Sequence, residues 1–187
     1  MSATGRSDVR YKDDNYSTPA WATRSIIPYV IPDRPISVLD PCAGTGSILC
    51  ELKVQCPWVQ RFAIEKDPAR GAECSLHSSM THIGDALSST EWPAVDLVLT
   101  NPPYRQAMVF LERALAETGR GGTVCMLLRL NFLGSQKRAA FWQSHPADIY
   151  VLSRRPSFAF GGTDATEYMW LVFAPERKER RWQILGP

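Results

Sequence analysis

Four consecutive residues, Asn101-Pro102-Pro103-Tyr104, could hold a flat chemical group that carries an amine. They directly follow the apolar run 95–100, which has the composition of a buried strand. Asn101 offers a side-chain carbonyl, and the two prolines stiffen the backbone and present the Pro102 carbonyl. Tyr104 adds a ring for stacking. Two acceptors and a ring suit the amino group of an aromatic base, although Asn-Pro-Pro is also common in the turn after a strand.

The segment from Asp40 to Ser47 (DPCAGTGS) has two glycines that let the backbone pass close to a ligand. It differs from a dinucleotide fingerprint because the third glycine is missing, and from a phosphate loop because no lysine follows Gly46. A carboxylate before the turn, at Asp40, would repel a pyrophosphate but suits a positively charged ligand such as a sulfonium amino acid. The simpler interpretation is a tight strand-to-helix turn that Asp40 caps.

Two further carboxylates follow predicted strands. Glu65 ends a strand predicted at 61–65, where a carboxylate can accept both ribose hydroxyls of a nucleoside. Asp67 is a neighbouring alternative, but we expect it to cap the helix that begins at Pro68. Asp85 follows the next strand and could accept a hydrogen bond from an adenine amino group, although Gly-Asp is also common in surface turns.

Helices and strands are predicted to alternate along the chain, which places these residues at one edge of a sheet. Strands are predicted at 36–40, 61–65, 81–85, 95–100, 122–130, 147–153 and 167–174. Helices are predicted at 19–29, 46–55, 68–79, 106–118 and 135–144, with Thr18 capping the first. This alternation indicates an α/β fold, a doubly wound sheet of seven strands with helices on both faces. The sheet should be mostly parallel with an antiparallel last strand, because only the loop 154–166 joins the last two strands.

The composition is that of a soluble globular domain. Of the 187 residues, 44% are apolar and 21% charged, and the net charge of +2 is too small to require a polyanionic partner. No apolar run is long enough to span a membrane, and residues 1–15 lack the apolar core of a signal peptide. Five cysteines without metal-binding spacing indicate free thiols, no metal site and a reducing, cytoplasmic location.

The Gly-rich turn, the acidic residue after the second strand, Gly84-Asp85 and Asn101-Pro102-Pro103-Tyr104 together resemble a known family. The chain resembles the class I S-adenosylmethionine-dependent methyltransferases of the amino-directed branch, most of all the bacterial and phage DNA adenine-N6 methyltransferases. The resemblance spans residues 15–174. It implies a Rossmann-like fold, S-adenosyl-L-methionine as the cofactor and adenine in DNA as the methyl acceptor.

The resemblance also implies roles for individual residues. Glu65 would hold the ribose of the cofactor, Asp85 its adenine amine, and Asn101 would lie beside the sulfonium. The residues implied around the methionine part of the cofactor are Tyr16, Thr18, Asp40, Ala43, Gly44 and Gly46.

The target base would have to be flipped out of a duplex or be single-stranded to reach this pocket. Its two amine protons would bind the Asn101 side-chain oxygen and the Pro102 carbonyl, while Tyr104 stacks on the ring. The loop 154–166 is expected to form the opposite wall. Its candidate residues for the base are Phe158 and Phe160, and those for phosphates are Arg154 and Arg155. The same residues could instead be a hydrophobic plug and solvated charges.

No separate target-recognition domain is expected. We expect residues 1–14 to be flexible, 15–174 to form the single domain, and 175–187 to be a charged, solvated tail. Because sequence-specific members of the family carry a large recognition region, the chain is expected to have relaxed specificity for DNA. The alternatives are an RNA adenine methyltransferase, a protein glutamine methyltransferase and a scaffold subunit without catalytic activity.

Overall fold

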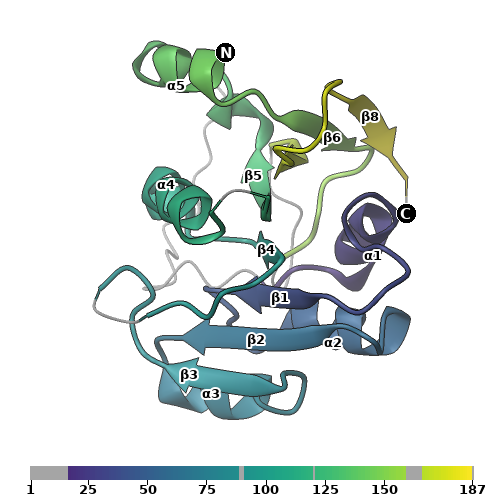
Figure 1. Cartoon of the computed structure of the whole chain (residues 1–187), viewed down its shortest axis with the longest axis vertical. Coiled ribbons are helices and arrows are strands. Elements are labelled where there is room, and N and C mark those ends of the chain that lie inside the picture. The colour runs from purple at the N-terminus through teal and green to yellow at the C-terminus, as the bar shows by residue number, and fades with distance from the viewer. Residues whose placement is uncertain (1–16, 89–90, 120, 159–165, 187) are drawn as a thin grey trace, which may run out of the picture.

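The computed structural model describes residues 17–88, 91–119, 121–158 and 166–186, which form one eight-stranded sheet with helices packed against it (Figure 1). The strand order is β3-β2-β1-β4-β5-β7-β6-β8. The strands are β1 (Ser37–Asp40), β2 (Gln60–Glu65), β3 (Met80–Ile83), β4 (Leu97–Thr100), β5 (Thr123–Arg129), β6 (Asp148–Leu152), β7 (Tyr168–Phe173) and β8 (Trp182–Leu185). The α-helices are α1 (Ala20–Val30), α2 (Ser47–Gln55), α3 (Pro68–Cys74), α4 (Ala107–Glu117) and α5 (Ala139–Ser144).

The strand directions confirm the predicted α/β class. β1 to β5 are parallel, and β7 is antiparallel to both of its neighbours, β5 and β6. The predicted number of seven strands was one too low, because β8 pairs in parallel with β6. β8 lies within 175–187, which the sequence predicted as a solvated tail. Residues 175–181 are indeed mostly exposed, but Leu185 is buried and brings the end of this segment into the core.

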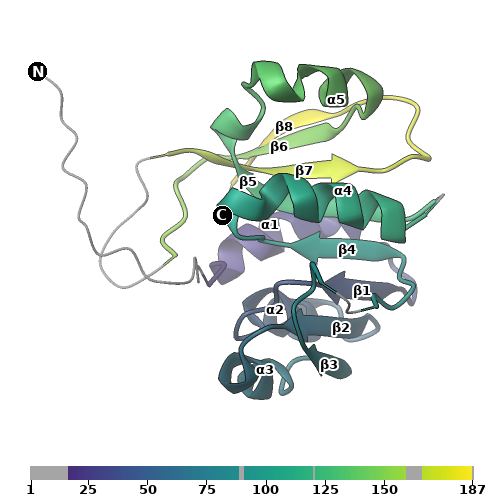
Figure 2. The ribbon, with the colours of Figure 1, turned by 90° about the vertical axis from the view of Figure 1, so that its left-hand side faces the viewer.

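Helices cover both faces of the sheet (Figures 1 and 2). α1 and α2 pack on one face, where Ile26 and Leu49 join the same core cluster as Val38 of β1. α4 packs on the other face, where Leu111 joins Leu39, the next residue of the same strand. Successive strand residues point to opposite faces, so a strand covered on both sides is apolar along its whole length. This pattern explains why the short central strands could be recognised from the sequence.

Several predicted helix boundaries differ from the structure, and α5 begins at Ala139, four residues after its predicted start. Thr18 was predicted to cap α1, but Pro19 is the N-cap residue and makes no side-chain capping bond. α3 ends at Cys74, five residues before the predicted end, and gives way to a turn. Asp67 caps α3 as predicted, because its side chain accepts a hydrogen bond from the Ala69 N–H.

A buried carboxylate at the start of β6 ties the segment after β7 to the rest of the domain. Asp148 is fully buried, and Arg177 donates a hydrogen bond to it from Nη1. Arg177 also donates from Nη2 to the carbonyl of Tyr29 in α1 (2.5 Å), and the Arg181 N–H donates to Asp148 Oδ1 (3.0 Å). The Arg177 guanidinium therefore balances the charge of Asp148. Together with the Arg181 N–H, it fixes the segment that precedes β8.

Replacing Arg177 with methionine should lower the free energy of unfolding by about 3–5 kcal/mol, because Asp148 would lose its hydrogen-bonded cation and keep only the more distant Arg180 Nη1 (4.0 Å). Urea denaturation measures this loss. The control Arg155→Met removes the exposed ion pair with Glu167 (2.6 Å) and should cost at most about 1 kcal/mol. Equal losses in the two variants would contradict the role given to Arg177.

Candidate cofactor and acceptor site

The main residues predicted from the sequence lie at the carboxyl ends of three neighbouring strands. Asp40 ends β1, Glu65 ends β2, and Asn101 follows β4 directly. β1 pairs in parallel with both β2 and β4, so these ends lie at one edge of the sheet. Ligands of doubly wound sheets bind at this edge.

The Gly-rich turn between β1 and α2 has a backbone that only glycine adopts readily. Gly44 and Gly46 have φ values of +56° and +86°. A Cβ on Gly46 would also lie 3.1 Å from the Cα of Cys74, so α3 closes the space beside the turn. The Ala43 N–H donates to the Ile64 carbonyl (3.1 Å) and joins the turn to β2. The turn is therefore fixed against both neighbouring elements.

Asp40 is a buried carboxylate at the base of this turn. Its Oδ1 accepts hydrogen bonds from the Thr100 hydroxyl (2.7 Å) and the Cys42 N–H (3.1 Å). Burial raises the pKa of Asp40 to about 7, and the negative charge of Glu65 acts in the same direction. A cation placed beside Asp40 would favour its ionised form, so the site is suited to a positively charged ligand.

Glu65 supports the Gly-rich turn from β2. Its Oε2 accepts from the Gly44 N–H (2.7 Å), and its Oε1 accepts from the Asp67 N–H (2.9 Å). The side chain is buried and thus has a fixed orientation. Each carboxylate oxygen can accept more than one hydrogen bond, so these contacts leave capacity for ligand hydroxyls.

Asp85 lies beyond β3 and is partly exposed. Its two oxygens accept from Lys66 Nζ and from the Leu87 N–H, both at 2.9 Å. The hydrogen bond from Lys66 lowers the pKa of Asp85, so this carboxylate is ionised. Because Lys66 follows Glu65, the contact links the ends of β2 and β3.

Thr18 joins the Gly-rich turn to Asn101. Its N–H donates to the Ser47 hydroxyl (3.1 Å), and its own hydroxyl accepts from Asn101 Nδ2 (3.1 Å). This contact turns the Asn101 amide nitrogen toward Thr18. The carbonyl oxygen of the same carboxamide therefore points away from Thr18. Thr18 therefore connects the two halves of the site, whereas Tyr16 lies outside the described residues.

Tyr104 lies against two side chains that the sequence did not single out, Arg129 and Tyr168. The guanidinium carbon of Arg129 lies 4.5 Å from the Tyr104 ring centroid, so the cation covers one face of the ring. Tyr168 packs against the same ring at 5.8 Å, and its hydroxyl accepts from Arg129 Nε (3.2 Å). Arg129 and Tyr168 are paired in the β5–β7 register, which explains why neither could be linked to Tyr104 from the sequence.

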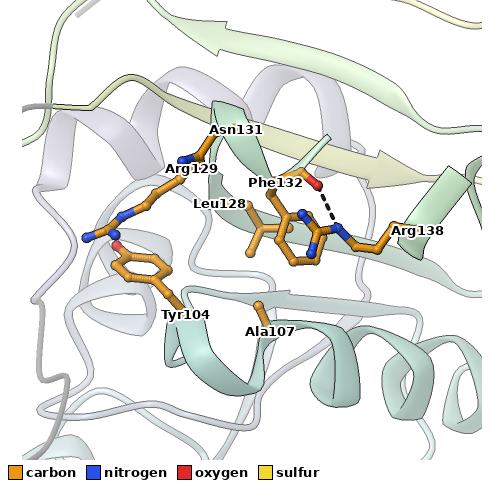
Figure 3. Close-up of a pocket in the computed structure, with 7 residues that line it drawn as sticks. All are labelled: Tyr104, Ala107, Leu128, Arg129, Asn131, Phe132 and Arg138. Carbon is orange, nitrogen blue, oxygen red and sulfur yellow. Dashed lines mark hydrogen bonds between the residues drawn. The ribbon is translucent and has the colours of Figure 1, made fainter. Parts of the chain in front are cut away.

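A pocket with a cavity volume of about 230 Å³ opens beside Tyr104 (Figure 3). It is lined by Tyr104, Ala107, Leu128, Arg129, Asn131, Phe132 and Arg138. The pocket lies between the start of α4 and the segment that follows β5. Among its lining residues, Tyr104 is one that the sequence predicted to contact the substrate.

Three of the four predicted second-wall residues lie within the described part of the chain. Phe158 is buried and packs edge-on against Tyr168 (4.9 Å), so it supports the aromatic group behind Tyr104. Arg154 stacks on Trp21 (4.3 Å), and Arg155 pairs with Glu167. Phe160 lies outside the described residues. Direct contact of these side chains with a substrate stays a prediction.

Comparison of the sequence with protein-family models and with curated proteins gave no match. Solved structures do match. A proposed class I S-adenosylmethionine-dependent methyltransferase from Listeria monocytogenes is similar with a TM-score of 0.68 and 16% identity, over 94% of this chain and 68% of that chain. This chain has the fold of the class I S-adenosylmethionine-dependent methyltransferases.

Two other structures with this fold differ in the acceptor that their names give. A dimethyladenosine transferase from Plasmodium falciparum has a TM-score of 0.63 and 15% identity, over 86% of this chain and 63% of that chain. A proposed O-methyltransferase from Agrobacterium tumefaciens has a TM-score of 0.63 and 17% identity, over 90% of this chain and 85% of that chain. The methyltransferase fold therefore leaves the acceptor to be argued from the site.

Two features are absent from the described residues. No helix within them is long and apolar enough to cross a membrane. Within the same residues, no three His, Cys, Asp or Glu side chains are grouped so that they could hold a metal ion.

Proposed function

We propose that this protein transfers a methyl group from S-adenosyl-L-methionine to the exocyclic amino group of adenine in a polynucleotide, with DNA as the favoured substrate. The observation that carries the proposal is the bridge through Thr18, which contacts Asn101 on one side and Ser47 on the other. Two hydrogen bonds through Thr18 thus connect Asn101, which would hold the acceptor amine (the amine clamp), with the Gly-rich turn, which would hold the cofactor. Methyl transfer requires this proximity of donor and acceptor.

The side chains around the turn fit S-adenosyl-L-methionine better than a pyrophosphate ligand. The buried Asp40 carboxylate would bind the ammonium of the methionine part, with the backbone of Ala43, Gly44 and Gly46 close beside it. Glu65 would accept from the ribose hydroxyls. When bound, this cofactor supplies a methyl group that its sulfonium makes electrophilic.

Two further contacts of the cofactor rest on the family resemblance. Asp85 would accept from the adenine amine of the cofactor, and it already accepts from Lys66 in the structure. Tyr16 would border the methionine part, next to Thr18 in the sequence.

The acceptor side would activate a weak nucleophile. The lone pair of the adenine amine is delocalised into the ring, and two hydrogen bonds from its protons favour a pyramidal nitrogen. We assign these acceptors to the Asn101 side-chain oxygen and the Pro102 carbonyl, which would also stabilise the developing positive charge. Pro103 keeps the backbone rigid, and Tyr104 would stack on the base. The methylated ammonium then loses its proton to water.

A single-stranded or flipped nucleotide is the form of the substrate that such a pocket can accept. The dimethyladenosine transferase and the O-methyltransferase match this fold equally well, so the adenine acceptor is argued from Asn101 and its surroundings. Because the described residues form one compact sheet domain, we propose relaxed sequence specificity on DNA. An RNA adenine is the second candidate substrate class, since the same clamp would accept it.

Product mapping tests the proposal. The protein should be incubated with methyl-labelled S-adenosyl-L-methionine and with unmethylated DNA, RNA or a glutamine-containing peptide of matched length. We expect N6-methyladenine in DNA, identified by nuclease digestion and mass spectrometry. Label found only in RNA would exclude the DNA assignment, and label found only in the peptide would exclude a nucleic-acid acceptor. An Asn101→Ala sample treated in parallel controls for a contaminating methyltransferase.

A further inference from the structure

The pocket beside Tyr104 carries positive charge from two arginines. Of the seven described residues that line it, Arg129 and Arg138 are cationic and none is anionic. Figure 3 shows their guanidinium groups toward opposite ends of the pocket, with Leu128 between them. Although the net charge of the whole chain is small, two of its cationic side chains line this one pocket.

Both guanidinium groups are held in place by aromatic rings. Arg129 lies over Tyr104 and donates from Nε to the Tyr168 hydroxyl. Arg138 lies 4.3 Å from the centroid of the Phe132 ring and donates from Nε to the Phe132 carbonyl (2.8 Å). In both cases Nε is used to fix the orientation. A guanidinium that is oriented in advance loses less entropy when it binds an anion.

We propose that this pocket binds the backbone phosphates next to the target nucleotide of a single-stranded polynucleotide. The inference rests on the proposed function and names the part of the substrate that the site recognises. Planar guanidinium groups bind phosphate oxygens with paired hydrogen bonds. Arg129 and Arg138 cover one face of Tyr104 and of Phe132, respectively, so a base of the single strand would stack on the opposite ring face. Arg129 would thus connect a phosphate with the ring on which the target base stacks.

Oligonucleotide binding tests this inference separately from catalysis. The probes are fluorescent single-stranded DNA and RNA oligonucleotides with one internal adenine, measured by anisotropy at several salt concentrations. We expect Arg129→Gln and Arg138→Gln each to weaken binding about fivefold. Each should also make the slope of log affinity against log salt less steep by about 0.7, the value for one lost contact with a single strand. Arg34→Gln, an exposed residue before β1, is the matched control and should leave both values unchanged.

A neutral methylphosphonate next to the adenine locates the contact. We expect it to weaken wild-type binding on at least one side of the adenine, and to have less effect in the variant that has lost the arginine for that phosphate. Two variants keep the test valid if Arg129→Gln fails to fold. Arg138→Gln changes a side chain outside the sheet, and Arg129→Lys retains the positive charge within it. Unchanged cofactor affinity, measured by calorimetry, shows that each variant is folded.

The outcomes separate the inference from the proposed function. If wild-type protein methylates the oligonucleotide while both Gln variants match Arg34→Gln in affinity and slope, the phosphate site is refuted and the function stands. If wild-type protein neither binds nor methylates any oligonucleotide, both are refuted. Equal competition by a polyglutamate of the same charge would also overturn the phosphate site, because it would show a general preference for anions.

Discussion

Replacing Asn101 with alanine should reduce the rate of methyl transfer by about 10²–10³-fold and leave the affinity for S-adenosyl-L-methionine within about threefold of wild type. The reason is that the side-chain carbonyl acts on the charge that develops on the acceptor nitrogen, which the bound cofactor alone does not carry. Single-turnover rates measure the first effect, and calorimetry measures the second.

Thr18→Val provides a matched comparison for Asn101→Ala. It removes the acceptor for Asn101 Nδ2 but retains the asparagine carbonyl, so transfer should fall by a smaller factor, about tenfold. If Asn101→Ala lost cofactor affinity to the same extent as the transfer rate, Asn101 would be a cofactor residue, and the clamp would have to lie elsewhere.

Replacing Asp40 with asparagine should weaken the binding of S-adenosyl-L-methionine at pH 7.5 by about a hundredfold, because the ammonium would lose a buried anionic partner. The wild-type affinity should depend on pH in a characteristic way. The pKa of Asp40 is raised to about 7, so below pH 7 binding must displace a proton, and affinity falls toward the limit of tenfold per pH unit. Above about pH 8 the α-amino group of the ligand loses its own proton. Affinity is therefore greatest between about pH 7 and 8.

The stability of the protein without cofactor should change with pH in the opposite direction. A carboxyl with a raised folded-state pKa stabilises the fold fully below its ordinary pKa of 3.8, and this stability is lost as pH rises through about 7. The Asp40→Asn variant should lack the loss of affinity below pH 7, measured by calorimetry, and the loss of stability as pH rises through about 7, measured by urea denaturation. Asp33→Asn, an exposed change before β1, should retain both. A wild-type affinity that is flat from pH 5.5 to 7.5 would contradict the role of Asp40.

Much of the fold was predictable because its signals are local. Central strands such as β4 and β5 are largely apolar runs, with Asn101 directly after β4 and glycines directly before β5, and each lies next to a helix with an apolar face. β8 was missed because only Leu185 of its four residues is buried, and a run of charged residues precedes it. Its place in the sheet depends on Asp148 and Arg177, which are distant in sequence.

The site was predictable to the extent that residue types carry their own chemistry. Asp40, Glu65 and Asn101 follow strands and have groups of an obvious kind. Arg129 and Tyr168 carry no such signal, because their importance comes from the Tyr104 ring that they contact. Phe158 was predicted to hold the base against Tyr104, which stays a prediction, and its contact with Tyr168 depends on the path of the loop and on the position of β7.

The position of β7 between β5 and β6 has a consequence for the order in which the molecule forms. The Gly-rich turn is built from β1, α2 and β2, which follow one another closely in the chain and make short-range contacts. The aromatic support of Tyr104 requires Tyr168 to insert beside Arg129, a pairing that closes a long loop and is slow for that reason. During folding, the cofactor half should therefore become protected first and the acceptor half last. Pulse-labelled hydrogen exchange would show this as early protection of β1 and β2 and late protection of β7, so that a newly made chain forms its Gly-rich turn before Tyr104 gains its aromatic support.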